Sequence, residues 1–154
     1  MKYITLFIVS SALVVFAGNL VNAADILPDP AQLTSLFQGK TVTITNGRPA
    51  DKRGGPDQPV NVYFSEMGIL EYLNDEGESN YRKWTVSEDG LFCVSRNFKR
   101  REQAMTCGTI VGDDSGEYRL YKSSDIKVKG GQVVGMKKKE MLLIFSNFVT
   151  GKKL

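Results

Sequence analysis

The chain contains no histidine. This absence excludes nucleophilic catalysis by a Ser–His or Cys–His arrangement, because histidine is the base in both. It also removes the commonest protein ligand of transition metals, and two cysteines alone make a poor zinc site. The segment 129–135 is rich in glycine, but it lacks the Lys-Ser/Thr that a phosphate-binding loop requires. We therefore expect a protein that is not an enzyme and that holds no metal or cofactor.

The chain also has little net charge. Its formal net charge is +3, which is too small to indicate a nucleic-acid binder without a dense basic patch. Hydrophobic residues make up 42% and charged residues 24%, which is the composition of an ordinary globular protein. A length of 154 residues is enough for one domain. We expect a single monomeric domain that does not bind nucleic acid.

The first residues have the pattern of a secretory signal peptide. A short positive segment, Met1-Lys2, precedes an almost entirely apolar run over residues 4–18, and Val21-Asn22-Ala23 ends in the small residue that a cleavage site requires. The apolar run is about 15 residues long, whereas a membrane span needs roughly 20. The pattern predicts a signal peptide over 1–23, or a cut after Ala24, and a mature domain over 24–154. An uncleaved N-terminal anchor is the alternative. We expect a secreted protein, located in a bacterial periplasm.

One short helix is predicted at the start of the mature domain. Asp29 can cap it, Pro30 suits the first helical position, and Gln32 can complete a capping box. Gly39 is a good stop signal. We expect a helix over about residues 30–38 that lies across the open end of a barrel or along the edge of a sheet.

From Lys40 onward the hydrophobic period changes to two, with Val42 and Ile44 on one face of the first predicted strand. No later segment is long and helical enough to connect parallel strands. The pattern therefore predicts an all-β fold, an antiparallel meander closed into a lipocalin-like barrel or folded as a sandwich. The strands are expected near 41–45, 60–64, 69–73, 81–86, 91–96, 105–111, 117–122, 126–129, 132–136 and 140–148.

The two cysteines fall on two of these strands. If the hairpin between them turns at Arg100, Cys93 lies directly opposite Cys107, Val94 opposite Thr106 and Phe92 opposite Gly108. Opposite positions of an antiparallel ladder are close enough for a disulfide. A secreted protein meets an oxidising compartment, so we expect a structural Cys93–Cys107 disulfide. A redox role would need a Cys-x-x-Cys motif or an activated thiol, and the sequence shows neither.

Two basic segments lie outside the predicted strands. Residues 46–59 form a loop of about 14 residues, which is longer than most connections, and residues 97–102 form the tip of the disulfide hairpin. Both could contact an acidic partner, or both could be solvated and without function. The candidate contact residues are Arg48, Lys52, Arg53, Phe98, Lys99, Arg100 and Arg101.

Lysines crowd the last 30 or so residues of the chain. Few aromatic residues are interleaved with them, so an anionic surface such as lipid head groups fits better than nucleic acid. A lysine-rich edge that only keeps the protein soluble is the alternative. The candidate residues for this contact are Lys127, Lys129, Lys137, Lys138 and Lys139.

Two motifs carry a resemblance. The predicted helix runs into Leu36-Phe-Gln-Gly39-Lys-Thr41, and Trp84-x5-Gly90-x-x-Cys93 is followed by a second cysteine before a tyrosine-containing strand. In these features the chain resembles a family of small, secreted, uncharacterised proteobacterial β-domain proteins. The resemblance implies a class and a compartment, and it carries no activity.

These observations favour a secreted, non-enzymatic binding protein for a small apolar or amphipathic ligand or for a protein partner. Aromatic residues are plentiful on the predicted strands, and in a roomy barrel the inward-facing ones would line an apolar pocket. The alternative is a small secreted inhibitor or accessory subunit that acts through loops 46–59 and 97–102. An enzyme of unknown type is the third interpretation.

Overall fold

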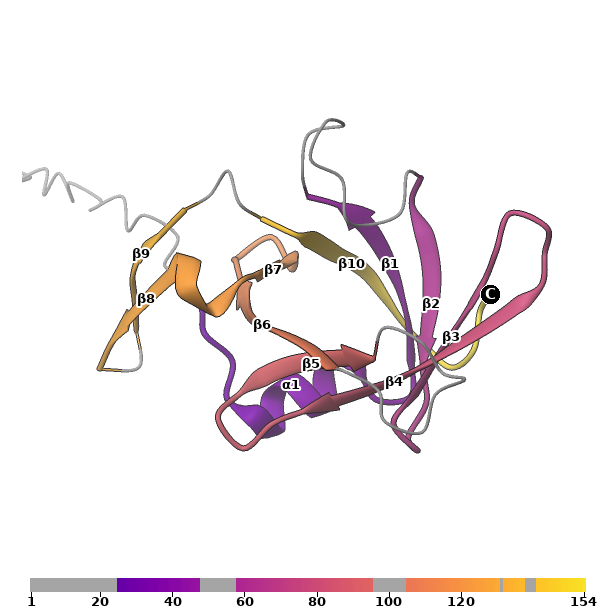
Figure 1. Cartoon of the computed structure of the whole chain (residues 1–154), viewed down its shortest axis with the longest axis horizontal. Helices are drawn as coiled ribbons and strands as arrows, with labels where there is room; N and C mark the ends of the chain where they lie inside the picture. The colour runs from indigo at the N-terminus through magenta and orange to yellow at the C-terminus, as the bar shows by residue number, and fades with distance from the viewer. Residues whose placement is uncertain (1–24, 48–57, 96–104, 131, 138–140) are drawn as a thin grey trace, which may run out of the picture.

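The chain folds into a closed antiparallel barrel of eight strands in the order β1-β10-β7-β6-β5-β4-β3-β2 (Figure 1). The barrel, and not the sandwich, is therefore the correct architecture. This computed structural model describes residues 25–47, 58–95, 105–130, 132–137 and 141–154. The elements are α1 (Pro30–Phe37), β1 (Lys40–Asn46), β2 (Val60–Phe64), β3 (Ile69–Leu73), β4 (Ser79–Val86), β5 (Leu91–Ser95), β6 (Met105–Gly112), β7 (Tyr118–Tyr121), η2 (Ser123–Asp125), β8 (Ile126–Lys129), β9 (Gln132–Met136) and β10 (Leu143–Thr150).

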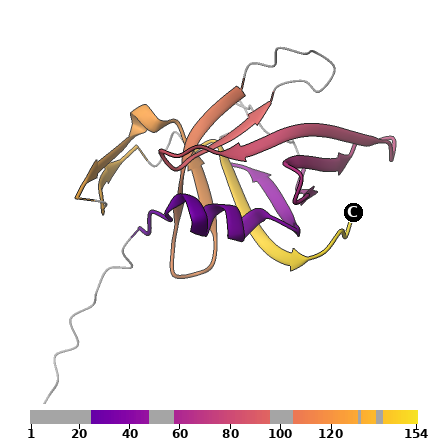
Figure 2. The same ribbon diagram turned by 90° about the horizontal axis from the view of Figure 1, so that it is seen from below.

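Helix α1 begins and ends as its sequence predicts. The side chain of Asp29 accepts a hydrogen bond from the backbone N–H of Gln32, and the side chain of Gln32 accepts one from the N–H of Asp29, which completes the capping box. The helix lies across one end of the barrel (Figure 2) and buries Leu33 and Phe37. Among the described residues, no helix is long and apolar enough to cross a membrane.

Four hairpin turns share one sequence pattern, Ser/Asn/Asp-x-x-Gly. In each turn the glycine has a positive φ of 73–81°, a conformation that costs glycine little, and its N–H donates to the carbonyl of the first residue at 2.9–3.3 Å. The side-chain oxygen of the first residue accepts a hydrogen bond from a backbone N–H further along the turn. Local chemistry therefore fixes four tight connections, which begin and end at Ser65/Gly68, Asn74/Gly77, Ser87/Gly90 and Asp113/Gly116.

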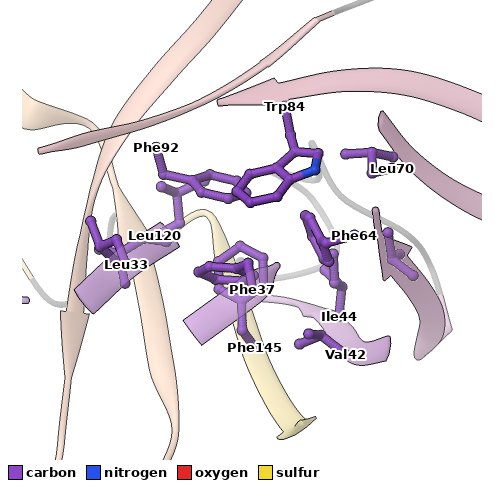
Figure 3. Close-up of a cluster of buried hydrophobic side chains, with 12 residues drawn as sticks. Leu33, Phe37, Val42, Ile44, Phe64, Leu70, Trp84, Phe92, Leu120 and Phe145 are labelled. Atoms are coloured by element: carbon purple, nitrogen blue, oxygen red, sulfur yellow. The ribbon is translucent and has the colours of Figure 1, made fainter. Parts of the chain in front are cut away.

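Aromatic side chains fill the barrel at the end that α1 covers (Figure 3). The ring of Phe37 reaches down from the helix and lies 4.8–6.3 Å, centroid to centroid, from five other rings. The indole N–H of Trp84 donates to the carbonyl of Ser65 at 3.3 Å, so this polar group is satisfied. We call this layer the aromatic floor; it consists of Phe37, Phe64, Trp84, Phe92, Phe145 and Phe148.

The register of the disulfide hairpin is confirmed. Strands β5 and β6 pair Cys93 with Cys107, Val94 with Thr106 and Phe92 with Gly108, and the two cysteines form a disulfide. Because Phe92 and Val94 point into the barrel, the alternation of strands places the disulfide on the outer face. Gly108, opposite Phe92, has no room for a side chain: a Cβ there would lie 2.4 Å from the carbonyl oxygen of Tyr121.

One part of the predicted meander is wrong. Strands β8 and β9 do not complete the barrel but pair with each other in a separate two-stranded sheet, which projects from the barrel in both views (Figures 1 and 2). The last strand, β10, pairs with β7 instead. The physical reason is a second apolar cluster on the outside of the barrel, where the base of the hairpin packs. Its buried members are Val111, Tyr121 and Ile126.

Replacement of Phe37 tests whether the aromatic floor depends on the helix. Phe37 is fully buried, so Phe37→Ala should lower the free energy of unfolding by about 3–5 kcal/mol through loss of burial and creation of a cavity. Chemical denaturation monitored by Trp84 fluorescence measures this change. The matched control is Ser35→Ala on the exposed face of the same helix, which should shift stability by no more than about 0.5 kcal/mol. Equal losses of stability in the two variants would contradict the dependence of the aromatic floor on Phe37.

Removal of the disulfide tests its role as a structural crosslink. The double variant Cys93→Ser/Cys107→Ser should be less stable by about 3 kcal/mol, because a loop of about 15 residues is no longer closed in the unfolded chain. Thermal denaturation with and without reductant checks this, and reduction should affect the native protein but leave the variant unchanged. An unaltered melting temperature after complete reduction would rule out this contribution.

Candidate ligand cavity

The barrel contains a cavity of about 700 Å³ beside the aromatic floor, and this cavity is open to solvent on one side. Its walls come from the alternating inward positions of the strands, which a barrel directs toward its axis. Half of the described lining residues are aliphatic, and Phe64, Phe92 and Phe145 of the aromatic floor form the base of the cavity. The other apolar lining residues are Ile44, Val60, Val62, Leu70, Val94, Leu120, Leu142 and Leu143.

The cavity lies toward the end of the barrel that α1 does not cover. Val60 and Leu143 are the first residues of their strands and Ser95 is the last of its strand, and all three line the cavity at that end. Four connections of the barrel join strands there: the short turn 74–78 and the longer segments 47–59, 96–104 and 122–142. At the helix end, β2–β3, β4–β5 and β6–β7 are joined by short turns. The fold therefore closes one end of the barrel and leaves its longest connections at the other.

Arg82 is the most distinctive polar residue of the cavity. It lies on β4 two positions before Trp84, so it faces inward one step above the aromatic floor, and it is partly buried. Its guanidinium lies 5.7 Å from the centroid of the Tyr72 ring and donates a hydrogen bond of 3.3 Å to the Tyr72 hydroxyl. Within the described part of the chain, Arg82 has no carboxylate partner.

Lys122 brings a second positive charge to the cavity. It follows Leu120 at the inward spacing, just beyond the end of β7, and it is exposed at the rim. No ion pair of Lys122 exists among the described residues. Ser95 and Thr106 add hydroxyl groups, and none of the lining residues that the structure describes is acidic. The cavity is thus apolar at its base and positively charged toward its open end.

The basic residues predicted from the sequence as contacts fall elsewhere. Lys127 and Lys129 are exposed on β8, in the hairpin outside the barrel, and Lys137 forms an ion pair of 3.0 Å with Asp125. These residues do not reach the cavity, and their contact with an anionic surface stays a prediction. The following candidate residues lie outside the described ranges: Arg48, Lys52, Arg53, Phe98, Lys99, Arg100, Arg101, Lys138 and Lys139.

The sequence analysis did not select Arg82, Tyr72 or Lys122 as site residues. A signal was present, because the alternation of residues 81–86 places Arg82 on the same face as Trp84. An arginine on the apolar face of a strand is unusual and marks a functional position more often than a lysine on the polar face does. Lys122 had a weaker signal, because it is the last residue of the strand predicted over 117–122 and shares a face with Leu120.

The groups with shifted pKa values lie outside the cavity. The hydroxyl of Ser115, followed by its N–H and the charge of Arg119, holds the pKa of Asp113 below its ordinary value in the turn between β6 and β7. The ammonium of Lys152 lowers the pKa of Glu71 on the outer face of β3, at an Nζ–Oε1 distance of 2.7 Å. Burial raises the pKa of Tyr121 in the second apolar cluster. These groups stabilise turns and strand contacts.

Comparison with known proteins gives no assignment: no family model, no curated protein and no solved structure matches the chain. Within the described ranges, no group of three or more His, Cys, Asp or Glu residues could hold a metal ion. At the cavity, the described residues offer apolar surface together with the positive charges of Arg82 and Lys122.

The Asp113 cluster predicts a pH-dependent stability. A carboxylate whose pKa is lower in the folded state stabilises the protein above its unfolded pKa, and this stability is lost as the pH falls through the folded pKa. Asp113→Asn should therefore destabilise the protein near pH 7, and its difference from wild type should shrink below about pH 4. Urea denaturation between about pH 3 and pH 7 measures the loss of stability in Asp113→Asn and its dependence on pH. The exposed neighbour Asp114 supplies the control, Asp114→Asn, and a difference that is constant with pH would contradict the mechanism.

Proposed function

We propose that this protein is a non-enzymatic binding protein that holds a small, largely apolar ligand inside its barrel. The observation that carries the proposal is the cavity of about 700 Å³ with aliphatic walls and an aromatic base. Ligand-binding cavities commonly have volumes of about 300–1,000 Å³, with apolar walls and a few polar groups. Protein interiors are otherwise packed with few voids larger than a water molecule, so a space of this size favours an occupant.

The disulfide supports a secreted location, and we propose the periplasm of a bacterium. Disulfides persist in oxidising compartments and are rare in the cytosol. The Cys93–Cys107 bond is placed directly across the ladder between β5 and β6. The apolar leader over residues 4–18 fits export to such a compartment. A ligand carrier there would keep a sparingly soluble compound away from water.

A neutral fluorescent probe, N-phenyl-1-naphthylamine, tests the proposal. Wild type should bind it at one site with an increase in emission, because the cavity removes the probe from water. Val94 lines the cavity, so Val94→Trp should weaken binding about tenfold or more by filling the space that the probe needs. Val60 also lines the cavity, from β2, three strands away from β5 in the barrel, so Val60→Trp provides a second variant if the first is unstable.

The matched control places the same bulk on the outside of the barrel. Val149 on β10 is 48% exposed, so Val149→Trp should leave probe affinity unchanged. Melting temperatures of all variants separate loss of folding from loss of binding. Wild type that fails to bind the probe, or cavity and surface variants that behave alike, would refute the proposal.

A further inference from the structure

We infer that the ligand is a single-chain amphiphile with an anionic head group, whose head lies at Arg82 and Lys122 and whose tail extends to the aromatic floor. This inference rests on the proposed function and adds the chemical class and the orientation of the ligand. It follows from the distribution of charge among the described lining residues, which include two cations and no acidic side chain in a mostly apolar setting.

Arg82 is the stronger part of the argument. Burial of a charge is costly unless the charge is paired, and the one described partner of Arg82, the Tyr72 hydroxyl, is neutral. A guanidinium has five N–H donors, and the described residues accept only one hydrogen bond from it. The remaining donors suit a carboxylate or phosphate, which can accept two parallel hydrogen bonds from an arginine.

The other cations with described partners show that this protein does neutralise positive charges. Arg119 contacts Asp113 and Glu117, Lys137 contacts Asp125, and Lys152 contacts Glu71. All three belong to turns or surface contacts outside the cavity. Arg82 and Lys122, which line the cavity, have no carboxylate partner among the described residues, and neither do exposed lysines such as Lys83 and Lys127. Arg82 differs from these lysines because it is partly buried and faces an apolar space. An anionic ligand would supply the missing partner.

The shape of the cavity sets the orientation. The apolar base is formed by rings of the aromatic floor and is closed by α1, so a charged group there would lose its hydration without a partner. Lys122 is exposed at the rim, and Arg82 lies one inward position above Trp84. A head group at these two residues leaves the alkyl chain against Val62, Leu70 and Phe145, where each buried methylene strengthens binding.

A series of ligands with one chain length and different head groups tests the inference. Isothermal titration calorimetry compares decanoate, decyl phosphate, 1-decanol and decyltrimethylammonium with wild-type protein, all below their micelle concentrations. The anionic compounds should bind about tenfold or more tightly than the alcohol, because hydrogen bonds to charged groups are the stronger ones. The cation should bind weakest. Added salt should weaken binding of decanoate and leave binding of decanol unchanged. The two anionic compounds together show whether a carboxylate or a phosphate head is preferred.

Substitutions of Arg82 and Lys122, with a control on β4, test whether the preference for an anionic head group arises in the cavity. Arg82→Gln should remove most of the advantage of decanoate over decanol, and Lys122→Gln should remove a smaller part of it. The control, Lys83→Gln, removes the same charge from the adjacent outward-facing and exposed position and should change nothing. If Arg82→Gln fails to fold, the head-group series on wild type and the Lys122→Gln variant still decide the question.

The outcomes separate this inference from the proposed function. Equal affinities for all four compounds, or equal effects of Arg82→Gln and Lys83→Gln, would overturn the anionic head group while the binding function stands. Failure of wild type to bind any of the four compounds and N-phenyl-1-naphthylamine would overturn both. A preference for anions that Arg82→Gln removes and Lys83→Gln preserves would support the inference.

Discussion

The insertion of Phe37 into one end of the barrel is the contact on which the rest of the interior depends. A barrel of eight strands has an interior that side chains can fill or that can hold one small ligand. Here the helix places one ring among five others, so that end is packed and closed. Because the capping box and Gly39 fix where the helix begins and where the chain turns into β1, the ring is delivered at a defined depth.

The cavity follows from a change in side-chain size along the barrel axis. Inward positions near α1 carry phenylalanine and tryptophan, whereas those further away carry Val60, Val94 and Leu143. Near α1 the large rings meet across the barrel axis. Further from α1 the smaller side chains do not meet, and the axis is left open there. A filled core and an apolar pocket were alternatives from composition, and the protein has both, one at each end of the barrel.

The partly buried charge of Arg82 has surroundings unlike those of the cations that form ion pairs outside the cavity. Arg119, Lys137 and Lys152 have acidic partners and stabilise turns or strand contacts. Arg82 lies over the Tyr72 ring and lines a space bounded largely by apolar groups, and in the described part of the chain its one hydrogen-bond partner is the Tyr72 hydroxyl. Such an arrangement does little for the fold, because the charge loses part of its hydration and gains no counterion among the described residues. It is better explained by an anion that arrives from outside.

The sequence by itself determined the helix and its caps, the strand alternation, the four glycine turns and the pairing of Cys93 with Cys107. Each of these depends on residues that are close along the chain or on the two-residue period of a strand, so local chemistry is sufficient. Tertiary structure decided that β8 and β9 leave the barrel and that the interior is hollow beside Arg82 and Lys122. Both results depend on which strands close the barrel and on the summed volumes of side chains from eight strands, which no local pattern records.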